Sequence, residues 1–262
     1  MDTAELEYDT ISQNRRLTRK EKRDLHQHRK SQQQQRNLNK EKLNFTLKDI
    51  HPLTHNQELT FEAYSQGKHL MLHGVAGTGK SFLALYLALN QIFNETSLYK
   101  KIIIIRSTVP TRDQGFQPGD AAAKEKVYEA PYIAICTELF GRGDAYQYLK
   151  NKNLIEFRST AFIRGITLND SIVIADEIAN YTGHELDTII TRIGKNCKLL
   201  FSGDFRQSDF IHQNDKKGLH DFMEIIKKIK NFEFIDFKKE DIVRSGLVKQ
   251  YIIEKDRQNI VF

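Results

Sequence analysis

The chain has 262 residues, 39% of them hydrophobic, and a mean hydropathy of −0.55. These values fit one globular domain with a buried core and an additional segment. The longest aliphatic run, at 102–105, is far shorter than the roughly 20 apolar residues that cross a bilayer, and the acidic N-terminus lacks the apolar stretch of a secretory signal. We therefore expect a cytoplasmic protein without a membrane partner. Cys136 and Cys197 lack the spacing of metal ligands, and we expect both to be ordinary buried thiols.

The positive charge of the chain is concentrated near its N-terminus. The net charge is +6, and residues 10–40 include ten basic side chains against two acidic ones. Residues 1–44 are rich in Arg, Lys, Gln and Asn and show no apolar face at helical spacing, so they cannot bury enough surface to offset the entropy of ordering. We interpret them as a basic tail, disordered or forming an exposed helix. It either only solubilises the chain or binds nucleic acid as an arm.

From residue 45 to residue 262 the composition is that of a globular domain, in which short apolar runs alternate with helical stretches. This alternation predicts a doubly wound α/β domain with a mostly parallel sheet covered by helices on both faces. Pro131 predicts a break or kink in the longest helix. In chain order we predict a strand at 69–73, a helix at 81–93, a strand at 102–105, a helix at 121–140, strands at 154–157 and 172–175, a helix at 184–192, a strand at 199–201, a helix at 219–228 and an edge strand at 232–237.

The segment at 74–81 reads Gly-Val-Ala-Gly-Thr-Gly-Lys-Ser and fits the P-loop pattern GxxxxGK[ST] at every position. Its glycines let successive backbone N–H groups surround phosphate oxygens, and the helix that follows presents its positive end to the anion. We predict that Lys80 contacts the β- and γ-phosphates of ATP and that Ser81 is a ligand of Mg²⁺, on a RecA-like domain. The alternative is a glycine-rich turn with an accidental lysine. The predicted nucleotide-binding residues of the loop are Gly74, Val75, Ala76, Gly77, Thr78, Gly79, Lys80 and Ser81.

Two carboxylates directly follow a predicted apolar strand. We predict that Asp176 holds Mg²⁺ and that Glu177 orients and deprotonates the attacking water. Because the nucleophile of a P-loop kinase is its substrate, the adjacent Glu177 favours hydrolysis over phosphoryl transfer. The alternative is a helix-capping Asp beside a solvated Glu. After the next strand, Asp204 and Gln207 are candidates for a contact to the γ-phosphate or its water; without the other motifs they would be ordinary turn residues.

Taken in order, these segments resemble the PhoH-like family of P-loop ATPases, relatives of the motor domain of superfamily 1 helicases. The match extends over about residues 48–248 and is more specific than the P-loop alone. The further segments that carry it are Leu-Thr-His-Asn-Gln at 53–57, Arg-Ser-Thr-Val-Pro at 106–110 with Gly-Phe-Gln-Pro-Gly-Asp at 115–120, Arg-Gly-Ile-Thr-Leu-Asn at 164–169, Thr-Arg-Ile-Gly at 191–194, Gly203 and Asp204 with Gln207 and Asp209, and Asp-Ile-Val-Arg at 241–244.

The resemblance implies further properties of the site and its partners. It implies that Gln57 contacts the adenine, that the protein forms a homo-hexamer, and that RNA or DNA, preferably single-stranded, is the partner. Two positions depart from the family pattern. Ala179 stands where a glutamine is common, so the role of that glutamine does not carry over, and Ile166 replaces an arginine. The compact chain is similar to phage-encoded members of the family.

The γ-phosphate needs a cation in the transition state. Superfamily 1 helicases take it from a second motor domain, but only about 55 residues follow Gln207, too few for such a domain. We therefore predict that a neighbouring subunit in a ring supplies an arginine. The alternative source of this arginine is the same domain. Arg244 is the first candidate and Arg192 the second; the alternative for each is an ordinary surface arginine.

Three functions are compatible with these motifs. We predict a ring-forming ATPase that acts on RNA or DNA as a helicase or translocase. The first alternative is a small-molecule P-loop kinase, against which Glu177 and Gln207 argue. The second is a nucleotide-dependent nucleic-acid-binding module in which slow hydrolysis acts as a timer.

Overall fold

The computed structural model describes residues 46–107, 121–204 and 213–258. Within these ranges the chain forms a six-stranded sheet with the order β3-β2-β4-β5-β1-β6, and every pairing is parallel. The prediction of a mostly parallel sheet is thereby confirmed. The basic tail at 1–44 and most of the segment at 106–120 lie outside the described residues. The strands are β1 (His69–Gly74), β2 (Lys101–Arg106), β3 (Ile155–Ser159), β4 (Ser171–Asp176), β5 (Cys197–Gly203) and β6 (Phe232–Phe237).

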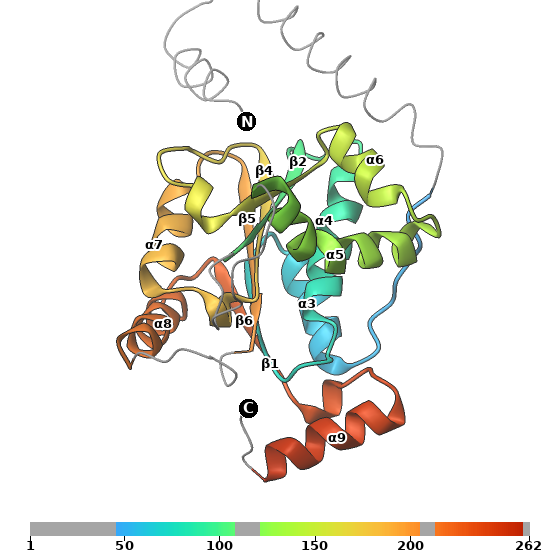
Figure 1. The fold of residues 1–262 in the computed structure, drawn as a ribbon, viewed down its shortest axis with the longest axis vertical. Helices are drawn as coiled ribbons and strands as arrows, with labels where there is room; N and C mark the ends of the chain where they lie inside the picture. The colour runs from blue at the N-terminus through green and yellow to red at the C-terminus, as the bar shows by residue number, and fades with distance from the viewer. Residues whose placement is uncertain (1–45, 108–120, 205–212, 259–262) are drawn as a thin grey trace, which may run out of the picture.

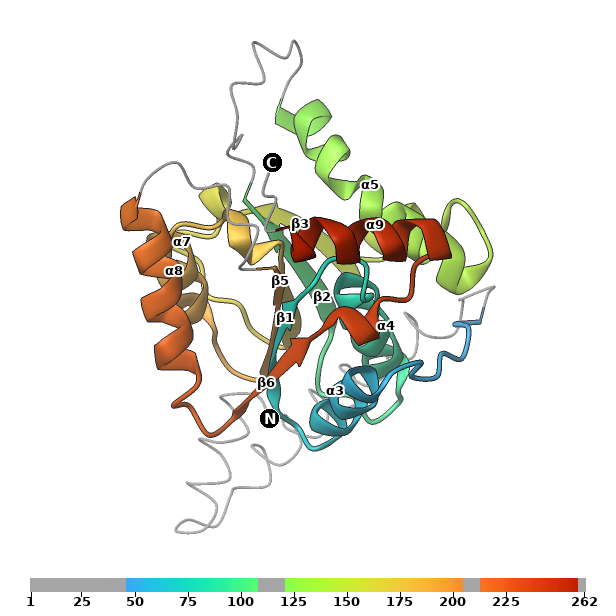
Figure 2. The same cartoon turned by 90° about the horizontal axis from the view of Figure 1, so that it is seen from below.

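Helices cover both faces of the sheet, as Figures 1 and 2 show from two directions. One face carries α3, α4, α5 and α6, the other carries α7 and α8, and α9 crosses the end of the sheet in Figure 2. No helix in the described ranges is both long and apolar enough to cross a bilayer. The helices are α3 (His55–Ser65), α4 (Lys80–Phe93), α5 (Ala121–Phe140), α6 (Ala145–Asn151), α7 (Gly183–Arg192), α8 (Gln213–Ile226) and α9 (Gly246–Arg257), with 3₁₀ turns at η1 (Thr160–Phe162), η2 (Ile178–Asn180) and η4 (Lys239–Asp241).

Successive residues of the central strands enter two different cores. In β2, Ile102 and Ile104 pack into the core beneath α4 and α5, whereas Ile103 and Ile105 pack into the core beneath α7 and α8. All four are at most 1% exposed. A strand covered on both faces needs an apolar side chain at every position, so it reads as an uninterrupted aliphatic run. The isoleucine run therefore specifies an interior strand of the sheet.

The strand order gathers the site residues at one edge of the sheet. Because β4, β5 and β1 are neighbours and parallel, their carboxyl ends lie side by side. The register pairs Asp176 of β4 with Ser202 of β5, and Gly203 of β5 with His73 of β1. The P-loop follows β1 directly, so the sheet brings the loop and the acidic pair together although about 100 residues separate them in the chain.

The predicted elements are confirmed with changes at their ends. Helix α8 begins at Gln213, earlier than residue 219, and α5 continues through Pro131. The apolar pattern does not predict α3, α6 or α9. Helix α3 has a local signal of another kind, because the side chain of Thr54 accepts a hydrogen bond from the N–H of Gln57 and caps the helix. Thr and Gln at this spacing are a capping-box pattern in the sequence.

Candidate nucleotide-binding site

The P-loop joins β1 to α4 and is locked to the end of β6. Gly74 has a φ of 125°, and a Cβ atom there would lie 1.9 Å from the carbonyl oxygen of Phe237. The N–H of Val75 donates to the same oxygen at 3.0 Å. Only glycine permits this approach of two backbones, so the first glycine of the motif fixes the position of the loop against the sheet.

Lys80 is the first residue of α4, and its side chain folds back over the loop. Its Nζ donates to the carbonyl oxygens of Gly74 and Val75, each at 2.8 Å, and the residue is only 9% exposed. The ammonium group therefore lies among the loop carbonyls at the positive end of α4, where charge and helix dipole both stabilise an anion. This placement suits the predicted contact of Lys80 with phosphate oxygens.

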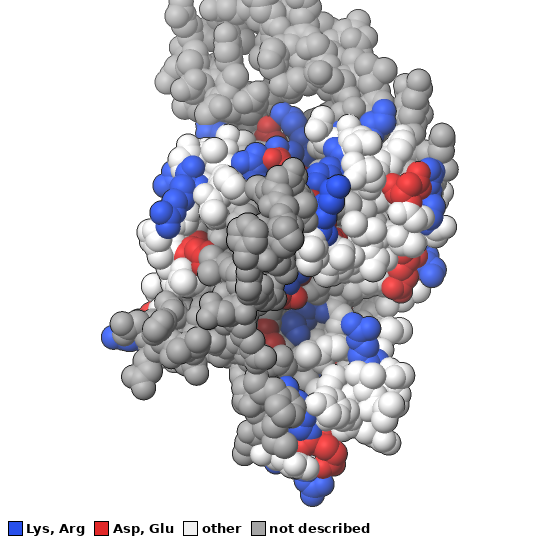
Figure 3. All heavy atoms as spheres, in the orientation of Figure 1, with Lys and Arg blue, Asp and Glu red and all other residues white. Residues whose placement is uncertain are grey.

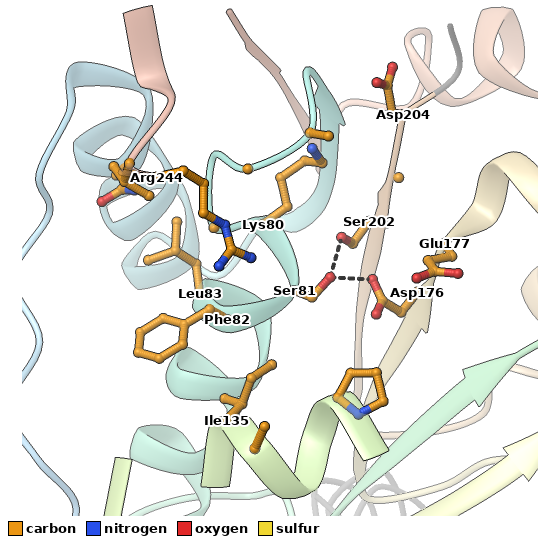
Figure 4. A pocket seen from close by; sticks show the side chains of 18 of the residues that line it. Lys80, Ser81, Phe82, Leu83, Ile135, Asp176, Glu177, Ser202, Asp204 and Arg244 are labelled. Atoms are coloured by element: carbon orange, nitrogen blue, oxygen red, sulfur yellow. Dashed lines mark hydrogen bonds between the residues drawn. The ribbon is translucent and has the colours of Figure 1, made fainter. Parts of the chain in front are cut away.

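Three oxygen-bearing side chains converge next to the loop (Figure 4). Ser81 Oγ, in the first turn of α4, donates to Asp176 Oδ1 at 2.7 Å and lies 3.5 Å from Ser202 Oγ. Asp176, the last residue of β4, is 3% exposed. Hydroxyl and carboxylate oxygens are the ligands that Mg²⁺ prefers, directly or through its waters. Ser81 and Asp176 therefore fit the ion that accompanies a nucleotide.

Tyr132 of α5 contacts the same carboxylate, and no sequence motif points to it. Its hydroxyl donates to Asp176 Oδ2 at 2.8 Å, and the residue is buried. Burial and the neighbouring Asp176 raise the pKa of Tyr132 well above its ordinary value, so the hydroxyl stays protonated and acts as the donor. The contact joins positions 44 apart in the chain, which a local pattern cannot reveal.

Glu177 follows β4 directly, with its backbone in the left-handed region at a φ of 55°. In Figure 4 its carboxylate points away from Ser81. It forms an ion pair with Arg106 at the end of β2, and Arg106 also donates to the carbonyl oxygen of Tyr128 in α5. Glu177 lines the cavity, but its charge is neutralised by Arg106 in this conformation. The predicted role in water activation therefore requires the carboxylate to leave this ion pair.

The side chain of Gln57 joins two segments of its own chain. Its Oε1 accepts from the N–H of Leu53 at 2.8 Å, and its Nε2 donates to the carbonyl oxygen of Thr78 in the P-loop at 3.1 Å. The residue is buried and lines the cavity. One N–H and one lone pair of the amide are left for a ligand. The predicted contact of Gln57 with adenine would therefore come in addition to a structural role.

Arg244 lies in the nucleotide cavity of its own chain. It belongs to the segment between η4 and α9, and in Figure 4 its guanidinium group points into the cavity. The N–H of the preceding Val243 donates to the carbonyl oxygen of Gly77 at 3.1 Å, which ties this segment to the P-loop. Arg192, the second candidate, ends α7 near the start of β5, at the opposite edge of the sheet. Arg244 is thus placed at the site of its own chain, and its predicted role in a neighbouring subunit stays a prediction.

One cavity has a volume of about 830 Å³, a size typical of small-molecule sites. Of the residues described above it is lined by Gln57, Lys80, Ser81, Asp176, Glu177, Ser202 and Arg244. Asp204, directly after β5, lines the cavity, and Gln207 lies outside the described residues. Ala179 also lines it, so a methyl group occupies the position where a glutamine is common in the family. The apolar part of the wall includes Ile50, Leu53, Phe82, Leu83, Ile135 and Val243.

Comparison with known proteins identifies the family of the chain. The family described as PhoH-like protein matches residues 49–254. The chain belongs to the PhoH-like family. It is 35% identical over 187 residues to the PhoH-like protein of Bacillus subtilis (strain 168), covering 71% of this chain and 57% of that one. It is 29% identical over 180 residues to the protein PhoH of Escherichia coli (strain K12), covering 68% and 50%. This PhoH-like chain thus spans about half the length of the curated relatives it matches.

A large terminase and a helicase are two solved structures whose backbone is similar to part of this chain. The large terminase of a thermophilic bacteriophage, in complex with ADP, has a TM-score of 0.43 and 13% identity and covers 76% of this chain and 49% of its own. Bacteroides Pif1 bound to single-stranded DNA has a TM-score of 0.38 and 12% identity and covers 82% and 48%.

The close approach of Gly77 and Arg244 yields a prediction. A Cβ atom at Gly77 would lie 2.9 Å from Cγ of Arg244, so Gly77→Ala should displace that arginine and lower nucleotide affinity on the order of tenfold. Gly67→Ala is the matched control, because Gly67 has a φ of 84° against 79° at Gly77 but has no atom within 4 Å of its Cβ position. Titration with a fluorescent ATP analogue gives the affinities, and equal affinities of the two variants would contradict this account.

Proposed function

We propose that this PhoH-like protein binds ATP together with Mg²⁺ and hydrolyses it. The observation that carries the proposal is the convergence of Lys80, Ser81 and Asp176 at one edge of the parallel sheet. Lys80 supplies a cation, and the other two residues supply a hydroxyl–carboxylate pair. A loop with the cation alone could bind many anions, whereas the three groups together suit a nucleoside triphosphate with its metal ion.

Each residue of the site has a defined task in this reaction. Lys80 and the backbone N–H groups of the P-loop bind the phosphates, and Ser81 and Asp176 would hold Mg²⁺. When bound, the ion neutralises charge on the phosphate oxygens. Glu177 orients a water that attacks the γ-phosphorus and accepts its proton, while ADP leaves. For this step Glu177 must turn from Arg106 into the cavity that it already lines.

The position of Glu177 in the cavity wall supports hydrolysis over the first alternative, a small-molecule kinase. A small-molecule kinase needs an acceptor pocket instead of a carboxylate that activates water, and Glu177 occupies the wall of the cavity beside Asp176. A binding module with slow hydrolysis would use the same residues, and the ion pair between Arg106 and Glu177 is compatible with slow basal turnover. Stimulation by a partner is therefore the property that decides between an active ATPase and a timer.

We propose RNA or DNA, preferably single-stranded, as that partner. In Figure 3 the Lys and Arg side chains on the described part of the surface alternate with Asp and Glu and form no large field of one sign on this face. The dense positive charge lies in the tail at 1–44, which supports a role for the tail as a nucleic-acid-binding arm. Assembly as a homo-hexamer, with activity as a helicase or translocase, is proposed on the family resemblance.

Two substitutions test the assignment of the chemistry. Lys80→Ala should abolish nucleotide binding, because the loop loses its phosphate-binding cation. Glu177→Gln should retain binding and stop hydrolysis, because the amide cannot accept the proton of water, with an expected loss of about 100-fold or more in turnover. Phosphate release without any added acceptor measures hydrolysis and excludes a kinase reaction. Hydrolysis by Glu177→Gln at the wild-type rate would show that another group activates the water.

Removal of residues 1–44 tests the role of the tail. Basic side chains that contact phosphates release counterions, so the affinity for single-stranded RNA or DNA should fall steeply with salt. The logarithm of the binding constant should fall against the logarithm of the salt concentration with a slope of about 0.7 per phosphate contacted. The truncated chain should bind more weakly, show a flatter salt dependence and lose most of the stimulation of ATP hydrolysis. Its basal turnover should be unchanged. An unchanged salt dependence would mean that the tail is only solvated.

The location of Arg244 yields a prediction about assembly. Arg244→Ala should reduce turnover within the subunit that carries it, and Arg244→Lys should restore only part of the activity, because lysine keeps the charge but not the planar fork. Co-expression of Arg244→Ala with Lys80→Ala should therefore give mixed assemblies without recovered activity. Recovery in verified mixed assemblies would show that Arg244 acts on the neighbouring subunit.

A further inference from the structure

Two hydroxyl groups hold the carboxylate of Asp176 from different elements. Ser81 in α4 donates to Oδ1 at 2.7 Å, and Tyr132 in α5 donates to Oδ2 at 2.8 Å. Ser81 lines the cavity, whereas Tyr132 is 1% exposed and belongs to the buried core. Each oxygen of the carboxylate thus has its own donor, one of which faces the nucleotide site and one of which belongs to the packed interior.

We propose that Tyr132 is a positioning residue for Mg²⁺ binding, and this inference rests on the proposed function. Its hydroxyl occupies Oδ2 and thereby directs Oδ1 toward Ser81, so that Asp176 presents a fixed oxygen where the ion binds. Groups that orient a metal-binding carboxylate through a hydrogen bond commonly change metal affinity by about 10- to 100-fold when they are removed. Tyr132 does not touch the nucleotide in this account and acts only through Asp176.

The surroundings of Tyr132 make the hydroxyl the part that matters for Asp176. Its ring packs in the core, with the ring of Phe157 at a centroid distance of 6.2 Å, so the ring position is set independently of the carboxylate. Asp176 is itself 3% exposed, so water has little access to replace a lost donor at Oδ2. Removing the hydroxyl alone therefore leaves the packing in place and frees the carboxylate to rotate.

Helix α5 also reaches the second acidic residue. Tyr128 lies one helical turn before Tyr132, and its carbonyl oxygen accepts a hydrogen bond from Arg106, which pairs with Glu177. The ring of Tyr128 lies 5.8 Å from the guanidinium carbon of Arg106. One face of α5 thus contacts Asp176 directly and Glu177 through an arginine. Helix α5 therefore positions the carboxylate of Asp176 and also supports Arg106, the ion-pair partner of Glu177.

The test is the nucleotide affinity of the full chain with Tyr132→Phe, measured by calorimetry with ADP in excess Mg²⁺ and again in EDTA. The variant should bind ADP about tenfold more weakly than wild type in Mg²⁺ and within about twofold of wild type in EDTA. The Mg²⁺ concentration that gives half-maximal hydrolysis should rise by a similar factor. If Tyr132 contributed only to the stability of the fold, its substitution would weaken ADP binding equally in Mg²⁺ and in EDTA.

Tyr181→Phe is the matched control. Tyr181 is equally buried, and its hydroxyl donates to the backbone carbonyl oxygen of Ile105 at 2.5 Å, so the substitution also removes one buried hydroxyl with its hydrogen bond. It should lower the melting temperature about as much as Tyr132→Phe and leave the Mg²⁺ dependence unchanged. A change in Mg²⁺ dependence that is equal in both variants would overturn the specific role of Tyr132.

The outcomes separate this inference from the proposed function. Suppose that wild type binds ADP in a Mg²⁺-dependent manner and that Tyr132→Phe has the affinity of wild type both in Mg²⁺ and in EDTA. This result would overturn the role of Tyr132 and leave the proposed function intact. Equal weakening with and without Mg²⁺ would also overturn it, because the effect would then be on the whole site. Wild type that does not bind ADP or ATP in Mg²⁺ would overturn the proposed function and this inference with it.

Discussion

The hydrogen bond between Ser81 and Asp176 joins the first turn of α4 to the end of β4 across the intervening strand β5. It can form only because three parallel strands end at one edge, and they do so because their apolar side chains fill a core on each face of the sheet. A shift of β4 by one residue would move Asp176 by about 3.3 Å and turn its side chain to the opposite face. The packing of the cores thus sets the geometry of the site.

The two acidic residues are held in different ways, and the difference matches the tasks we propose for them. Asp176 is buried and bonded to hydroxyl groups from two helices, so its position is fixed before any ligand arrives. Glu177 is half exposed and is held by the charge of Arg106, which a conformational change can separate. A metal ligand benefits from a rigid position, whereas a base that must reach a water needs freedom to turn. The pair therefore combines a rigid and a movable carboxylate on adjacent residues.

Local patterns are what the sequence reveals reliably here. The uninterrupted aliphatic runs predict the interior strands, and the glycine spacing predicts the loop between β1 and α4, because each depends only on neighbouring residues. The contacts of Tyr132 with Asp176 and of Arg106 with Glu177 depend on how α5 and β2 pack against β4, and they join positions 44 and 71 apart. The same is true of Arg244, whose place in the cavity of its own chain follows from the path of the segment after β6. Such tertiary contacts leave no periodic signal in one sequence.

The nucleotide cavity takes walls from distant parts of the chain. The segment with Leu53 and Gln57 precedes the P-loop, whereas Val243 and Arg244 come after the last strand of the sheet. The end of β6 also holds Gly74 in place. During synthesis the P-loop is therefore made long before the later residues that fix its position and complete the cavity. Under the proposed function, ATP would therefore bind tightly only after Val243 and Arg244 have been made, and it would stabilise that state by mass action while giving little help to earlier folding intermediates. The ligand would thus stabilise only chains that extend at least to Arg244, and it would do so late in their synthesis.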